Sequence, residues 1–114
     1  MATAVFIHEG SAIDYTPAAD VAAGDVVVQN ELVGVARLDI KADTLGALAV
    51  TGVFDFPKAT GGGTAIDVGL DVYWDAAAGE ATTDEGSGSV NKKIGRSVAA
   101  ATDDDETVRA RLSQ

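Results

Sequence analysis

The chain contains no cysteine, so it can form neither a disulfide framework nor a thiolate metal site. Its single histidine, His8, excludes sites built from several histidines and leaves one candidate general base. No nucleophile in a recognisable motif stands near the His8-Glu9 pair, so we expect His8 to face solvent at the end of an apolar segment. No apolar run is long enough to span a bilayer. The sequence also does not begin with the basic region followed by an apolar region that is typical of a signal peptide. These absences favour a soluble protein made in a cytoplasm.

Aromatic residues are also scarce. They make up 5% of the 114 residues, although 46% of the residues are hydrophobic. The core must therefore be built from Val, Ala, Leu and Ile, which bury less area per side chain. A monomer with such a core is expected to be only moderately stable, so burial against a partner would help it.

Basic residues are outnumbered. The chain has 8 Lys and Arg against 18 Asp and Glu, for a formal net charge of −10. A surface this acidic repels phosphate backbones and anionic lipid headgroups. We therefore expect no nucleic-acid partner and no membrane partner.

Short β-type segments separated by turn residues fill most of the chain. We expect strands at Thr3–His8, Val26–Val28, Leu32–Leu38, Ala47–Phe56, Val72–Trp74, Ile94–Ala99 and Thr107–Leu112. In the last of these, alternation places Arg109 and Arg111 on the face opposite Val108, Ala110 and Leu112. Helical signals reach at most one turn, at Ala18–Ala23 or Ala76–Ala78. The prediction is an all-β fold, a small barrel or sandwich of short strands, in a single domain over residues 1–114.

The two halves of the sequence resemble each other. Residues 21–28 are similar to residues 66–74, and an apolar segment that carries a glycine follows each, with Gly34 in the first half and Gly95 in the second. An acidic stretch then precedes the last strand of each half, at Asp39–Asp43 and at Asp103–Glu106. This pattern suggests a pseudo-duplicated unit with approximate twofold symmetry, although the match is short and rich in Gly and Val.

Two polar stretches could suggest a ligand site. Gly61-Gly62-Gly63-Thr64 lacks the lysine of a phosphate-binding loop, so we expect a flexible loop there, as at Thr82–Asn91. Asp103–Glu106 lacks the spacing of a calcium-binding loop, so a solvated turn is expected. We therefore predict no catalytic residue, no cofactor and no metal site.

The candidate contact residues are Thr3, Val5, Phe6, Ile7 and Trp74. The stretch Ala2–Ile7 is uncharged and β-prone, so residues 1–10 form either an arm that pairs with a partner or the first strand of the protein's own sheet. Tyr73 and Trp74 are neighbours in a predicted strand, so one ring should enter the core and the other face outward. An outward ring would suit a contact, and a core role for both is the alternative.

The order of the short motifs resembles a known family. These motifs are Gly24-Asp25-Val26-Val27, Val33-Gly34-Val35-Ala36, Thr51–Lys58, Gly69–Asp75, Ile94-Gly95 and Thr107–Leu112. The chain resembles phage capsid cement (head decoration) proteins, which often carry the label of predicted RecA/RadA-type recombinases. A recombinase needs an ATP site and a basic DNA-binding surface, and this sequence has neither motif nor charge for them.

The resemblance implies a non-enzymatic, β-barrel-like virion protein, typically a homotrimer. It would bind the outer surface of the expanded capsid, where major capsid protein subunits meet, and stabilise their contacts. The alternatives are another virion subunit, such as a tail or fibre component, or a surface module that binds carbohydrate. A small hydrolase with paired carboxylates is a further alternative, but no two acids stand at a defined spacing.

Overall fold

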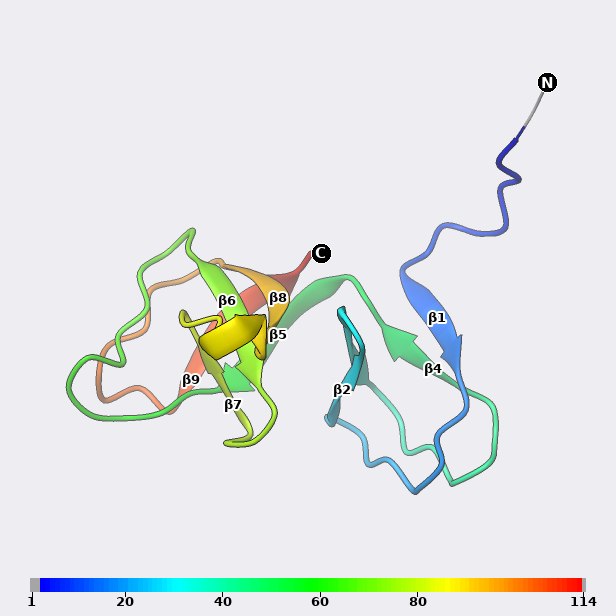
Figure 1. Ribbon diagram of the computed structural model, residues 1–114, viewed down its shortest axis with the longest axis horizontal. Helices are drawn as coiled ribbons and strands as arrows, with labels where there is room; N and C mark the ends of the chain where they lie inside the picture. Colours follow the sequence, from blue (N-terminus) through cyan, green and yellow to red (C-terminus); the bar gives the residue numbers. More distant parts are fainter. Residues whose placement is uncertain (1–2, 114) are drawn as a thin grey trace.

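The computed structural model describes residues 3–113, and its regular elements are almost entirely short strands (Figure 1). The strands are β1 (Ala12–Tyr15), β2 (Val26–Gln29), β3 (Leu32–Ala36), β4 (Gly46–Ala49), β5 (Gly52–Pro57), β6 (Asp71–Asp75), β7 (Glu80–Thr82), β8 (Lys92–Ser97) and β9 (Thr107–Leu112). A 3-10 turn, η1 (Ser87–Ser89), is the helical element of these residues. The predicted all-β class is confirmed, and the helical turn lies at neither of the two expected places.

The strands form two antiparallel sheets that are not closed into a barrel. The N-terminal sheet has the order β1-β4-β3-β2, and the C-terminal sheet has the order β5-β9-β8-β6-β7. Figure 1 shows the two sheets side by side, joined where β4 leads into β5. The single strand predicted at Ala47–Phe56 is therefore wrong. The chain leaves one sheet after Ala49 and enters the other at Gly52, whose φ of 114° favours glycine.

The two sheets share one backbone frame, as the resemblance between the halves predicts. Without β7, the C-terminal order β5-β9-β8-β6 repeats β1-β4-β3-β2 strand for strand. The same bridge precedes each second strand, between Val21 and Ile40 and between Ile66 and Ala101. The amide of Gly24 donates to the carbonyl of Ala36 at 2.6 Å.

The second half repeats that glycine contact. The amide of Gly69 donates to the carbonyl of Ser97 at 2.9 Å. The pairing register then aligns Gly34 with Gly95, because Gly34 pairs with Val27 and Gly95 pairs with Val72. The halves are therefore equivalent position by position along their central strands.

The halves differ in what joins the second and third strands of the frame. In the N-terminal sheet, the residues between β2 and β3 are Asn30 and Glu31, and Asn30 has a φ of 55° that suits a tight hairpin. In the C-terminal sheet, residues 76–91 stand at that position, and they contain β7 and η1. β7 covers the outer edge of β6 through pairs such as Trp74 with Ala81.

Two clusters of buried side chains fill the molecule. The larger one belongs mainly to the C-terminal sheet and includes Phe56, Ile66, Val72, Trp74, Ala81, Ile94, Ala101, Val108, Ala110 and Leu112. Val33 and Val35 of β3 belong to it as well, so one face of the N-terminal sheet packs on the second half. The smaller cluster, on the other face of that sheet, has Ala36, Ile40 and Leu48 at its centre.

Candidate binding surfaces

The N-terminal arm, residues Thr3–Gly10, lies outside both sheets. Its three large apolar side chains are almost fully exposed, at 78% for Val5, 77% for Phe6 and 79% for Ile7. Figure 1 shows this segment running away from the body of the molecule before β1 begins. The strand expected at Thr3–His8 is therefore wrong, because this segment pairs with neither sheet, whereas its pairing with a partner stays a prediction. Ala2, part of the predicted contact stretch, lies outside the described residues.

His8 belongs to this arm and is exposed, as predicted. Its Nδ1 accepts a hydrogen bond of 2.9 Å from the amide of Gly10, whose φ is 77°. The arm therefore turns at its junction with the folded body.

Trp74 lies in the core, where 9% of it is exposed and its ring centroid is 6.3 Å from that of Phe56. Tyr73, its neighbour, is half-buried. Alternation thus correctly predicts that one ring enters the core. Trp74, which we named as a candidate contact, is that inward ring, so it offers little surface to a partner.

An apolar groove of about 1080 Å³ lies where the two sheets meet. It is lined by Leu38, Leu45 and Val53, which are largely exposed, and by the half-buried Phe54. No local sequence pattern predicts this groove, because its walls combine the β3–β4 loop with residues of β1, β4 and β5.

Cations gather on the outward face of the C-terminal sheet. We call this the basic face and define it by Lys93, Arg96, Arg109 and Arg111. These are four of the eight basic residues of an acidic chain. Alternation in β9 predicted the outward direction of Arg109 and Arg111, but it did not place β8 beside them.

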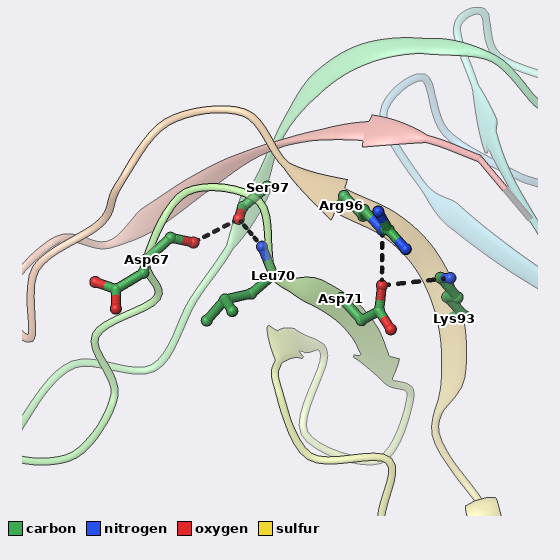
Figure 2. Close-up of polar contacts among 6 residues, drawn as sticks. All are labelled: Asp67, Leu70, Asp71, Lys93, Arg96 and Ser97. Atoms are coloured by element: carbon green, nitrogen blue, oxygen red, sulfur yellow. Dashed lines mark hydrogen bonds and ion pairs between the residues drawn. The ribbon is translucent and has the colours of Figure 1, made fainter.

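Two carboxylates partly neutralise the basic face. Asp55 on β5 receives two hydrogen bonds from Arg109, at 2.9 and 3.2 Å. Asp71 on β6 lies 3.1 Å from Arg96 and 3.3 Å from Lys93 (Figure 2). Among the described residues, Arg111 has no ion pair.

These ion pairs favour the charged forms of their members, so they lower the pKa of an aspartate and raise the pKa of an arginine. The hydrogen bond from Arg109 lowers the pKa of Asp55, and the same bond raises the pKa of Arg109. Hydrogen bonds from Arg96 and then Lys93 lower the pKa of Asp71. Both carboxylates therefore stay charged to lower pH than a free aspartate.

Ser97 holds the segment that leads into β6. Its buried hydroxyl donates to the carbonyl of Asp67 at 2.6 Å and accepts from the amide of Leu70 at 3.1 Å (Figure 2). This anchors the residue directly before Asp71. The position of Asp71 between Arg96 and Lys93 is therefore fixed by the backbone.

The glycine-rich loop binds a carboxylate of its own chain. The Asp103 carboxylate accepts hydrogen bonds from the amides of Thr64, at 3.1 Å, and Ala65, at 2.8 Å. The amide of Gly61 donates to the Asp103 carbonyl at 2.9 Å. These donors are the groups that a phosphate would need, and Asp103 of the same chain occupies them.

Within the part of the chain that the structure describes, no helix is long and apolar enough to cross a membrane. Groups of three or more possible metal ligands are also missing from these residues.

Comparison with known proteins gives one family. The family model described as phage cement protein matches residues 7–112, nearly the whole chain. No match was found among the curated proteins or among the solved structures. Because one family model spans both sheets, the chain belongs to the phage cement protein family, which has a structural role in phage capsids.

Proposed function

We propose that this protein binds the outer surface of the expanded phage capsid and stabilises contacts between major capsid protein subunits. The match to the cement family over residues 7–112 is the observation that carries this proposal. A protein that binds only the mature lattice stabilises that lattice by mass action. The role is one of binding, with no catalysis, and several copies acting together, as in a homotrimer, would add avidity to weak single contacts.

The N-terminal arm is our proposed shell contact. Val5, Phe6 and Ile7 expose apolar area that a monomer leaves in water, and their burial would favour binding at about 25 cal/mol per Å². The backbone of Thr3–Ile7 is unpaired with either sheet, so it is free to add a strand to the edge of a capsid sheet.

Co-sedimentation with shells of the same phage, before and after expansion, tests the proposal. We expect binding to expanded shells only, saturating at a fixed ratio to the capsid protein. If neither form of the shell binds the protein, a tail or fibre subunit becomes the better reading, and imaging of labelled protein on virions would locate it.

A matched pair of variants tests the arm. Val5→Ser, Phe6→Ser and Ile7→Ser together should abolish or strongly weaken shell binding. The control replaces Val68 and Val90, which are 61% and 67% exposed elsewhere on the surface, by serine. Equal shell binding by both variants would remove the arm from the proposal while leaving the cement function in place.

A further inference from the structure

The basic face places like charges side by side. In the register of β8 and β9, Arg96 lies directly opposite Arg111, and Val53 of β5 lies on the other side of Arg111. Directly opposed like charges destabilise a sheet. With Lys93 and Arg109, the four cations meet the two carboxylates Asp55 and Asp71, so the part of the face around β8 and β9 is positive in a chain of net charge −10. Asp75 and Glu80 lie beyond it, at the end of β6 and the start of β7.

The N-terminal sheet shows that the fold does not require these arginines. The pair that corresponds to Arg96 and Arg111 is Val35 and Ala49, which stand opposite each other in β3 and β4. The same hydrogen-bonded frame forms around these uncharged residues. The valines of that face pack on the second half, whereas the corresponding face of the C-terminal sheet is left open.

The open face also has the other features of a contact surface. Lys93, Arg96 and Arg111 line a shallow depression of about 360 Å³ together with Val98 and Ser113. Val53 and Val98 are 54% and 42% exposed, so apolar area adjoins the arginines. Arginine beside exposed apolar side chains is typical of protein interfaces, where lysine and acids are depleted.

The acidic run Asp103–Glu106 would complement the basic face, but within one chain it lies too far from Arg111 to contact it. The acidic run Asp103–Glu106 stands just before β9, and Arg111 stands near the far end of that strand. A strand advances about 3.3 Å per residue, and β9 is held rigid by pairing on both sides. Asp103 and Asp105 accept backbone hydrogen bonds locally, whereas the side chains of Asp104 and Glu106 have no partner among the described residues.

We propose that the basic face binds the acidic run Asp103–Glu106 of a second copy, head to tail. Each copy carries both sides of such a contact, so the contact can close into a ring. The inference rests on the proposed assembly of several copies on the shell and names the surface that joins them. Exposed ion pairs contribute little affinity each, so the charges set register and partner choice while Val53 and Val98 add buried area.

Charge reversal tests the contact in the full chain. Sedimentation velocity at low and high salt measures self-association of the wild type, Arg111→Glu and Asp104→Arg, with Lys41→Glu as a control at an exposed loop cation. We expect the first two variants to associate at least about tenfold more weakly, since each places like charges in contact. The double variant Arg111→Glu/Asp104→Arg should recover association, because it restores opposite charges with the signs exchanged.

Thermal unfolding and shell binding of the same variants distinguish a broken contact between copies from misfolding and from a contact with the capsid. Arg111→Glu removes the repulsion with Arg96, so its thermal midpoint should not fall, and Asp104→Arg lies in a loop. A double variant that fails to recover association, or a wild type that is monomeric at every salt concentration, would overturn the inference. Loss of shell binding by Arg111→Glu with intact self-association would also overturn it and assign the basic face to the capsid. Wild-type binding to expanded shells, measured in parallel, reports on the proposed function independently.

Discussion

In the N-terminal half, the frame of four strands has a centre of three buried side chains, Ala36, Ile40 and Leu48. In the C-terminal half, the equivalent frame encloses Phe56, Trp74 and most of the larger cluster. The bridges and the glycine hydrogen bonds are nevertheless the same in both halves. Backbone pairing therefore sets the topology of each half, and side-chain size sets how much apolar area each one buries.

The largest effect should come from the two equivalent glycines. A Cβ at Gly95 would collide with the backbone carbonyl oxygen of Arg111. A Cβ at Gly34 would lie 2.9 Å from the Leu48 Cβ and 3.3 Å from the Ala49 carbonyl oxygen, so its clash is less severe and a small shift between β3 and β4 can relieve it. We expect Gly95→Ala to lower the free energy of unfolding by more than about 3 kcal/mol and Gly34→Ala by about 1–3 kcal/mol. Urea unfolding of both variants measures the difference. Equal losses of unfolding free energy would contradict the inference that the backbone approach at Gly95 is closer than that at Gly34.

Two equivalent aromatic residues differ in burial. Phe56 and Tyr15 occupy the same position in β5 and β1, but Phe56 is buried and Tyr15 is half-exposed. Phe56→Ala should cost about 3–5 kcal/mol, because it leaves a cavity in the main core. Tyr15→Ala should cost about 1–2 kcal/mol. Thermal unfolding of the two variants checks the order, and a larger loss at Tyr15 would mean that the smaller cluster is the more important one for stability.

The smallest effect concerns an ion pair that one half has and the other lacks. Asp55 pairs with Arg109, whereas the equivalent Asp14 stands opposite Ala47. Because the pKa of Asp55 is lowered in the folded state, its stabilisation is present above the unfolded value of about 3.9 and is lost as the pH falls through the folded value. Asp55→Asn should therefore flatten the dependence of stability on acid pH, as measured by denaturation at several pH values.

The reciprocal variant Ala47→Arg serves as its control. It offers Asp14 the missing partner and should add no more than about 1 kcal/mol, an increase that high salt removes. A gain that is independent of salt would point to packing by the arginine stem instead of charge.

Much of the frame can be predicted from the sequence, because its signals are local. The repeated glycines and valines predict the duplicated strands, and the alternation of β9 predicts its outward arginines. The Tyr73-Trp74 pair shows a limit of such signals. Alternation says that one ring turns inward, but the pairing of β6 with its neighbours decides that this ring is Trp74.

The features that the sequence does not predict depend on pairing between strands that lie far apart in the chain. β1 is four residues long, carries Asp14 in its middle and pairs with β4 far along the chain. The crossing between sheets at residues 50–51 interrupts a continuous apolar pattern, and only Gly52 marks it. The basic face combines β8 and β9, and the pairing register that brings Arg96 beside Arg111 is not specified by any local pattern.

The unequal connections between the second and third strands bear on how the protein could be engineered. At the position where the N-terminal half has the Asn30-Glu31 turn, the C-terminal half accommodates residues 76–91 without a change in strand order. The entropy of closing a longer loop rises only slowly with its length. A peptide epitope grafted into the Asn30-Glu31 turn should therefore leave the fold intact, which makes that turn a site for displaying foreign sequences.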